Sequence, residues 1–380
     1  MFSPINRILY SQTPLEARHT FIFICGIHGN ETAGYDGLKR VINYIKKNHI
    51  ALNCNFYALT GNINALEHKV RFIDRDLNRL WTHDHIKKLT EKNTINYSEA
   101  KEQLELLHCI KTILDSHNGT FIFADIHTTS STTVPFITIS DSLNNRAIAS
   151  KFSLPIILGI EEHLDGPLLT YINEFGHIAL GFEAGEHHAV ASIDNCEAFV
   201  WSLLSKMKGV DKQHIPIHKF NKRLRPNKTL ANFYEINYRY GIEDSNTFNM
   251  HAGFLNFALI TKNQVLATHR AKPVKASKKG RIFLPLYQNQ GDDGFFIISK
   301  ISNVWLQVSY VLRKLRLSSL LIILPGVKQD PTKNYVLVVN PKTAKFLVIK
   351  LFHVFGYRKR ITIGDFYYFV RRDRKIIPMK

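Results

Sequence analysis

The first 213 residues alternate short apolar runs with longer amphipathic segments, and this alternation limits the fold more than any other feature. The runs at 20–27 and 120–126 are continuous and apolar, which is typical of strands buried on both faces. In the segment 98–117, apolar residues recur at intervals of three and four, which predicts a helix that covers a sheet. Alternating strands and helices predict an α/β fold with a mostly parallel, mixed sheet flanked by helices.

The other elements of this region follow the same pattern. We expect three further strands, at 51–59, 155–160 and 178–183. We expect four further helices, at 31–48, 143–152, 167–175 and 189–207. The pattern changes after about residue 215, because the segment 214–228 is rich in Pro, Lys and Asn and is expected to be a linker.

We therefore divide the chain into three parts. Residues 1–213 are expected to form the α/β domain, residues 225–300 a small β domain, and residues 301–380 a basic appendage of mixed helix and strand. Within the appendage we expect one helix at 304–317 and strands that include 335–339 and 346–351.

The positive charge of the chain lies mostly in this appendage. Residues 301–380 contain 16 Lys and Arg against 3 Asp and Glu, so +13 of the formal net charge of +19 lies there. A basic surface can attract an anionic membrane or nucleic acid. No nucleic-acid-binding motif accompanies the charge, so we expect no specific nucleic-acid partner and interpret the appendage as a solvated basic surface.

The sequence also bears on the compartment. The first 19 residues lack the apolar core of a signal peptide, and the longest apolar runs are too short to span a bilayer. The four cysteines are scattered without a CxxC pair, which argues against a disulfide framework or a cysteine metal site. We expect a cytoplasmic protein without a transmembrane segment, and a homo-oligomer is compatible with the sequence.

Residues that can bind a metal follow the ends of predicted strands. His28 and Glu31 follow the first apolar run, His127 follows the run at 120–126, and Glu183 ends a later one. Because ligands bind outside the carboxyl ends of strands in such sheets, we expect these side chains to meet. Two histidines and a carboxylate form a first shell for catalytic zinc, although the same donors also suit iron, cobalt or manganese. Asp125 is a candidate to orient His127 through its second ring nitrogen.

These residues belong to a set of motifs that resembles the succinylglutamate desuccinylase/aspartoacylase family of zinc carboxypeptidase-like hydrolases. The motifs follow the order of the family over about residues 20–190: His28-Gly29-Asn30-Glu31, Arg71 with Asp76-Leu77-Asn78-Arg79, Asp125-Ile126-His127, and Gly181-Phe182-Glu183-Ala184-Gly185. A weaker likeness covers residues 280–287. The resemblance implies a zinc carboxypeptidase-like fold and one Zn²⁺ per chain, bound by His28, Glu31 and His127.

The resemblance also implies roles for five other residues. Glu183 would act first as general base and then as general acid. Arg71 would stabilise the oxyanion of the tetrahedral intermediate. Asn78 and Arg79 would bind a substrate carboxylate, and Tyr287 would contact the substrate from the small β domain.

Alternatives remain open for these roles. Glu186 and His187 lie close enough in the sequence to compete with Glu183 for the proton-transfer role. The two arginines could instead form structural salt bridges with Asp74 or Asp76. The tyrosine could be a buried aromatic residue.

The predicted function is zinc-dependent hydrolysis of the amide bond in an N-acyl amino acid or a similar small anionic molecule. Aspartoacylases carry a further substrate arginine shortly before the catalytic glutamate, but the segment 171–175 contains none, which argues against N-acetylaspartate. Arg146 is a candidate substitute. The alternatives are a carboxypeptidase that acts on a short peptide and a non-catalytic binding protein.

Overall fold

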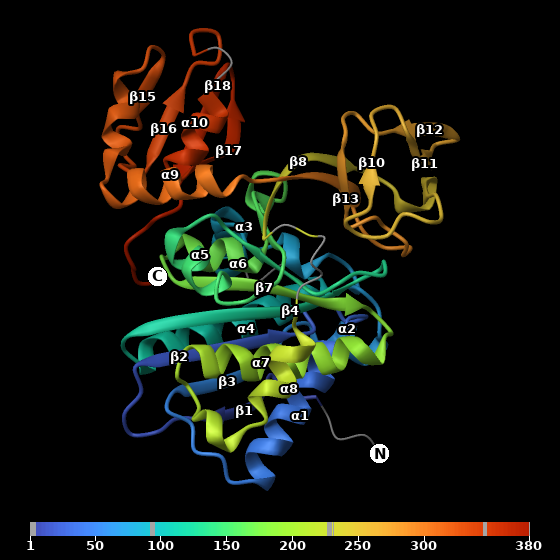
Figure 1. The fold of residues 1–380 in the computed structure, drawn as a ribbon, viewed down its shortest axis with the longest axis vertical. Helices are drawn as coiled ribbons and strands as arrows, with labels where there is room; N and C mark the ends of the chain where they lie inside the picture. The colour runs from blue at the N-terminus through green and yellow to red at the C-terminus, as the bar shows by residue number, and fades with distance from the viewer. Residues whose placement is uncertain (1–4, 92–95, 226–229, 231, 345–347, 380) are drawn as a thin grey trace.

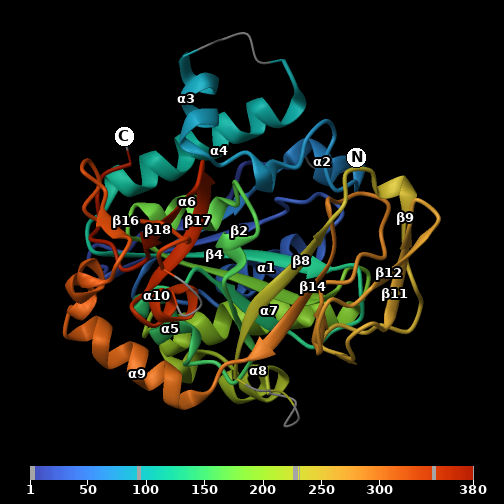
Figure 2. The same cartoon turned by 90° about the horizontal axis from the view of Figure 1, so that it is seen from above.

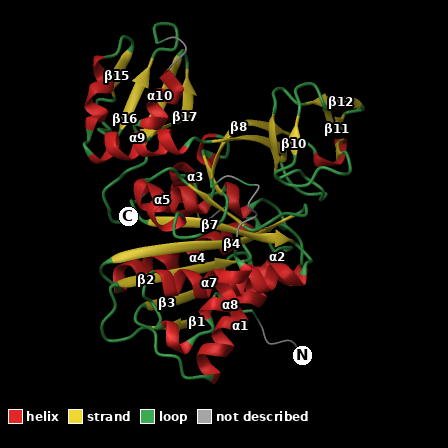
Figure 3. Ribbon diagram, viewed as in Figure 1, coloured by secondary structure: helices red, strands yellow, loops and turns green. Residues whose placement is uncertain are grey.

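A mixed eleven-stranded sheet runs through the molecule, with helices on both faces of its parallel part (Figure 1, Figure 3). The computed structural model describes residues 5–91, 96–225, 230, 232–344 and 348–379. The strand order is β1 (Ile8–Gln12), β3 (Asn55–Thr60), β2 (His19–Cys25), β4 (Thr120–Thr129), β7 (Ile178–Glu186), β5 (Phe136–Ile139), β6 (Ile156–Leu158), β8 (Phe233–Gly241), β14 (Asp293–Lys300), β13 (Gly280–Phe283) and β10 (Leu259–Ile260). The predicted α/β fold is confirmed.

The centre of the sheet is parallel, as the sequence predicts. β3, β2, β4 and β7 pair in parallel, whereas β1 and β5 run antiparallel to their neighbours β3 and β7. Parallel neighbours bring their carboxyl ends to the same edge of the sheet. The ends of β2, β4 and β7 therefore lie side by side.

Each central strand contributes side chains to two hydrophobic cores, because successive side chains point to opposite faces of the sheet. Phe21 and Phe23 of β2 belong to a core with helices of one face, whereas Ile22 and Ile24 belong to a core on the other face. The first core includes residues from α1 (Ala33–Lys47), α5 (Leu143–Ala149), α7 (Val190–Lys206) and α8 (Ile217–Arg223). The second includes residues from α3 (His83–Glu91), α4 (Ser98–Ser116) and α6 (Leu168–Glu174).

The C-terminal half carries two smaller sheets, which stand on the same side of the main sheet (Figure 1). One contains β12 (Lys272–Lys275), β11 (Val265–His269) and β9 (Phe248–Met250). The other contains β15 (Val327–Gln329), β16 (Val336–Val339), β18 (Phe366–Arg371) and β17 (Tyr357–Ile363), with α9 (Asn303–Lys314), the 3-10 helix η5 (Leu317–Ile323) and α10 (Val348–Val354) beside it. The main sheet continues into the C-terminal half where β6 pairs with β8. The division into three domains stays a prediction.

Two sequence-based expectations for secondary structure are wrong. The expected linker at 214–228 contains α8, whose Ile217 and Phe220 join the core; residues 226–228 lie outside the described residues. The expected strand at 346–351 is helical from residue 348 onward in α10, and residues 346 and 347 lie outside the described residues. A short apolar run does not distinguish a strand from a buried helix, and here Phe352 packs its ring against Phe369. No helix among the described residues is long and apolar enough to cross a membrane.

Candidate metal centre and active-site cavity

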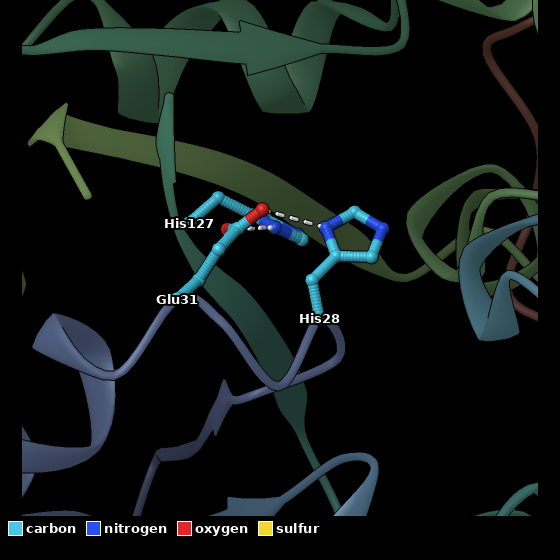
Figure 4. A group of neighbouring side chains, drawn as sticks. All are labelled: His28, Glu31 and His127. Carbon is cyan, nitrogen blue, oxygen red and sulfur yellow. Dashed lines mark hydrogen bonds and ion pairs between the residues drawn. The ribbon is translucent and has the colours of Figure 1, made fainter. Parts of the chain in front are cut away.

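Three side chains from two strand ends converge on a buried cluster (Figure 4). His28 and Glu31 follow β2, and His127 lies within β4, which extends beyond the predicted strand end. The Nδ1 atom of His28 is 2.8 Å from Oε1 of Glu31, and the Nδ1 atom of His127 is 3.0 Å from Oε2 of the same carboxylate. One ligand atom from each residue lies within 4.8 Å of the others, so a single metal ion can reach all three.

The outer nitrogen of each histidine contacts a second carboxylate. His28 Nε2 is 3.2 Å from Asp76 Oδ1, and His127 Nε2 is 2.7 Å from Asp125 Oδ2. A carboxylate on the outer nitrogen fixes the ring orientation of a metal-bound histidine and leaves the other nitrogen for the ion. The sequence predicted this arrangement for Asp125 but not for Asp76.

The electrostatics of the cluster also suit a cation. Burial lowers the pKa of His127, but the carboxylates of Asp125 and Glu31 outweigh it and raise this pKa well above its usual value. Burial likewise opposes ionisation of Glu31, yet the two histidines hold its pKa well below the usual range. Two imidazoles and the carboxylate of Glu31 form a buried donor set that fits a divalent zinc ion, with Asp76 and Asp125 behind the two rings.

The turn that carries His28 and Glu31 requires a glycine. Gly29 lies directly against α2 (Ile63–His68), where an added Cβ would come within 2.0 Å of the carbonyl carbon of Ala65. The preceding Gly26 has φ +66°, and its carbonyl accepts a 2.7 Å hydrogen bond from the amide of Asn62. The His-Gly-Asn-Glu motif is therefore a tight turn held against α2 as well as a source of ligands.

A buried carboxylate that the sequence analysis missed holds the next motif. Glu99, at the start of α4, is fully buried and accepts hydrogen bonds of 2.7–3.1 Å from the backbone amides of residues 73, 74 and 75. The helical spacing of Glu99, Gln103, Leu106 and Ile110 on the buried side of α4 was the available signal.

Arg71 contacts both Asp76 and the metal cluster. Its Nε and Nη2 atoms donate to Asp76 Oδ2 at 3.2 and 2.9 Å, which is the structural salt bridge considered as the alternative. Its Nη1 atom lies 3.7 Å from Oε1 of Glu31. Arg71 therefore borders the metal cluster while Asp76 fixes its orientation.

Glu183 faces the same cavity from the neighbouring strand. Residues His127 and Glu183 are register partners where β4 pairs with β7. The Oε2 atom of Glu183 is buried and has no hydrogen-bond partner among the described residues. Burial raises the pKa of Glu183 to about 8, against the opposing effect of His127. A carboxyl group in this state can accept and release a proton near neutral pH.

The two competitors for the role of Glu183 have other contacts. Glu186 is exposed, and its Oε2 atom accepts a hydrogen bond from Thr132. His187 lines the cavity, but its Nδ1 atom is 2.7 Å from the hydroxyl of Thr128 and its Nε2 atom is 3.1 Å from Gln288 Oε1. Burial lowers the pKa of His187, which keeps this ring neutral.

Arg79 and Asn78 are anchored in the cavity wall. The Nη2 atom of Arg79 donates to Asp293 at 2.7 Å and to Asp292 at 3.3 Å, so its partners are neither Asp74 nor Asp76. These two aspartates are more than 200 positions away in the sequence, which is why the sequence analysis missed them. The side-chain oxygen of Asn78 accepts a hydrogen bond from a backbone amide of α6 at 2.9 Å, and no hydrogen bond from its Nδ2 is formed with any described residue.

Two residues that the sequence suggested as substrate contacts, Tyr287 and Arg146, are not among the residues that line the cavity. Tyr287 is 38% exposed, is not part of the cavity wall, and donates its hydroxyl to the carbonyl of His251 at 2.8 Å. It is therefore not a buried aromatic residue, and its contact with the substrate stays a prediction. Arg146 also lies outside the cavity wall, because it donates from Nε to the buried Asp141 at 2.5 Å. It cannot replace the arginine that is absent from residues 171–175.

The cavity is small and has two kinds of wall. Its volume is about 150 Å³, with the metal cluster, Arg71 and Glu183 at one end. Polar side chains that include Asn78, Arg79 and Asp293 line another part, and the apolar part of the wall includes Ile160, Leu164, Leu169, Leu284, Leu286 and Phe296. The segment 284–293 closes one side, where Gln288 accepts from Asn30 at 2.9 Å and Gln290 accepts from the amide of Arg71 at 3.1 Å.

Comparisons with known proteins agree with the family that the sequence motifs indicate. Residues 17–205 match the model of the succinylglutamate desuccinylase/aspartoacylase catalytic domain. The succinylglutamate desuccinylase of Pseudoalteromonas atlantica is 30% identical over 88 residues, which cover 23% of this chain and 25% of that enzyme. The matched segment thus spans about a quarter of the curated relative.

Solved structures match over a larger part of the chain. The succinylglutamate desuccinylase of Vibrio cholerae is 17% identical with a TM-score of 0.57, and the match covers 76% of this chain and 83% of that one. A mutant of murine aminoacylase 3 is 14% identical with a TM-score of 0.54 and covers 76% and 96% of the two chains. At this level of identity the likeness concerns the fold alone.

Proposed function

Because this chain belongs to the succinylglutamate desuccinylase/aspartoacylase family, we propose that it is a metal-dependent hydrolase of the amide bond in an N-acyl amino acid or a similar small molecule. The products would be a carboxylate and a free amine. The observation that carries the proposal is the convergence of His28, Glu31 and His127 in a cavity that Glu183 also lines. We keep the cytoplasm as the proposed compartment.

We propose that His28, Glu31 and His127 hold one Zn²⁺ per chain. A zinc ion there would supply Lewis-acid activation of a water molecule and of the scissile carbonyl. Asp76 and Asp125 hold the outer ring nitrogens, so that both Nδ1 atoms face Glu31. This orientation supports the assignment of the three ligands.

The proton transfers fall to Glu183 in this proposal. Its unpartnered Oε2 would take the proton from the attacking water and deliver it to the nitrogen of the leaving amine. The raised pKa of Glu183 supports both steps, because a carboxyl group that titrates near neutrality can both accept a proton and release it. Arg71, held by Asp76 beside the cluster, would donate from Nη1 to the developing oxyanion.

The residues of the cavity wall indicate which groups of a substrate can bind there. We propose that the Nδ2 of Asn78 and the guanidinium of Arg79 bind a single substrate carboxylate. Arg79 already pairs with Asp292 and Asp293, so less positive charge is available than two free arginines would supply. The segment 284–293, which closes one side of the cavity, favours a small molecule over a peptide of several residues.

The test is release of free amine from a panel of N-acetyl, N-succinyl and N-formyl amino acids and tripeptides by the zinc-loaded protein. Turnover should disappear with a chelator and return with zinc. Glu183→Gln should keep bound zinc but lose about 10²–10⁴-fold in kcat.

Glu186→Gln is the matched control, because it changes an exposed glutamate three residues further along the same strand. It should retain turnover. Normal turnover in Glu183→Gln would refute the proposed mechanism. Stoichiometric zinc without cleavage of any member of the panel would refute the proposed substrate class.

A further inference from the structure

Helix α9 packs Leu306 and Leu312 against the protein, yet its two fully buried side chains, Ser309 and Arg313, are polar and an apolar stripe faces outward. Arg313 is buried and donates from Nε to Asp373 at 2.7 Å and from Nη1 to Asp141 at 3.2 Å. Ser309, also buried, accepts from Nη1 of Arg146 at 3.4 Å. A surface helix ordinarily buries its apolar stripe and exposes its charges. Packing within this chain therefore does not account for the apolar residues on the other side of α9.

Those residues form a continuous stripe. Val304, Val308, Val311 and Leu315 follow at intervals of four, three and four, which places them on one face of the helix. All four are exposed, Val304 to 68% and Leu315 to 63%, and Trp305 beside them is 59% exposed.

The neighbouring 3-10 helix extends this surface. η5 packs against α9 and leaves Leu320, Ile322 and Ile323 exposed, the last to 75%. We call the outward residues the α9–η5 face: Val304, Trp305, Val308, Val311, Leu315, Leu320, Ile322 and Ile323. Figure 2 shows α9 at the periphery of the molecule, away from the small sheet of β9, β11 and β12. A partner can therefore approach this helix from outside.

The charge around this face has one sign. Residues 300–329 contain five basic residues and no aspartate or glutamate. Four of them are exposed: Lys300, Lys314, Arg316 and Lys328. The fifth, Arg313, forms buried ion pairs. Tyr310 is also exposed, with the ammonium of Lys314 5.8 Å from its ring centre. An apolar patch with a purely basic rim is suited to an anionic partner.

We propose that the α9–η5 face docks this protein onto the surface of an anionic lipid bilayer. The valines, leucines and isoleucines would enter the boundary between headgroups and acyl chains, where tryptophan and tyrosine are also favoured. The exposed lysines and arginine would contact the anionic headgroups. The attachment is peripheral in this proposal, because α9 has only 12 residues and its buried side is held by the protein.

Two features favour a bilayer over a second copy of this chain. Two such faces pressed together would bring two basic rims into contact, which opposes association. A bilayer instead offers both apolar depth and negative charge to the same surface. The buried pairs of Arg313 with Asp141 and Asp373 hold α9 in place, so docking needs no refolding of the helix.

The test uses the full chain and vesicles of equal parts phosphatidylglycerol and phosphatidylcholine. The protein should float with these vesicles at low salt, and binding should weaken at high salt and with vesicles of phosphatidylcholine alone. Trp81 and Trp201 are buried, so a blue shift of tryptophan emission on binding reports Trp305 and should vanish in Trp305→Phe.

Serine replacements at three positions of the stripe, Val304→Ser, Val311→Ser and Leu315→Ser combined, should weaken vesicle binding about tenfold or more. Leu255→Ser combined with Leu259→Ser is the matched control, because both leucines are exposed elsewhere on the molecule. This control should bind as the parent does.

Three results would overturn the proposal. The first is that the protein fails to float with anionic vesicles at low salt. The second is that the parent and the triple serine variant bind these vesicles equally. The third is a dimer in light scattering that the serine replacements convert to a monomer while vesicles bind neither protein. That last result would assign the face to a second copy of the chain.

Discussion

The carboxylate of Asp141 connects the α/β region to the appendage, and Asp141→Asn tests how much this connection contributes to stability. The side chain is fully buried between β5 and α5. It accepts from Arg146 at 2.5 Å, from Arg358 Nη2 at 2.7 Å and from Arg313 Nη1 at 3.2 Å. Two of these arginines belong to the appendage, so one buried carboxylate contacts guanidinium groups from both parts, and Asp373, Glu162 and Glu235 pair with the same two arginines.

The expected cost follows from what the substitution leaves behind. An asparagine keeps the shape and one acceptor but removes the charge, so the guanidinium groups of Arg313 and Arg358 stay buried with weaker compensation. Breaking a buried ion pair by removing one partner costs about 3–5 kcal/mol. We expect a loss in this range for the free energy of unfolding at pH 7.

The pH dependence has a definite sign. Burial opposes ionisation of Asp141, but Arg146, Arg358 and Arg313 outweigh it and hold its pKa well below the usual range. A depressed pKa contributes stability that is fully present above the unfolded value of about 4 and is lost as the pH falls toward the folded value. The difference between the parent and Asp141→Asn should therefore be constant near neutrality and shrink below about pH 4.

The assay is urea unfolding followed by circular dichroism, with Asp365→Asn as the matched control. Asp365 pairs with Lys342 at 2.5 Å, but both side chains are exposed, by 66% and 72%. An exposed pair of this kind contributes less than about 1 kcal/mol. A loss below about 1 kcal/mol in Asp141→Asn would refute the reasoning, because it would place the buried cluster in the class of exposed pairs.

Three further predictions concern the cluster, its turn and the appendage. Asp125→Asn should weaken zinc affinity about 10–100-fold in a competition titration with a chelator, since it alters the group that orients His127; unchanged affinity would contradict the orienting role. Gly29→Ala should lower both zinc occupancy and the unfolding midpoint, because its Cβ would meet the α2 backbone; a zinc-replete variant of parental stability would show that the turn relaxes. His353 contacts Glu235 at 2.7 Å and Glu162 at 3.1 Å, and although burial and Arg358 lower its pKa, these carboxylates outweigh them and raise it. The stability from its cationic form is present below about pH 6.5 and is lost as the pH rises through the folded pKa, so His353→Gln should lose more stability at pH 6 than at pH 9; an equal loss at both pH values would contradict the charged state.

The sequence by itself determined the central sheet and the convergence of the metal cluster, because both follow from local pattern. Continuous apolar runs such as 20–27 can only be buried strands or buried helices, and the alternation with amphipathic segments selects a parallel sheet. Parallel strands bring their carboxyl ends together, so His28 and His127 meet although they are 99 positions apart in the sequence.

Only the tertiary structure decided which groups surround that cluster and what the appendage contacts. Arg79 pairs with Asp292 and Asp293, and Asp141 gathers arginines from residues 146, 313 and 358. No periodicity links such positions, because ion pairs depend on which surfaces fold together rather than on spacing along the chain. For the same reason, the apolar and basic residues of α9 were visible in the sequence, but the buried pairs of Arg313 decide which side of the helix faces outward.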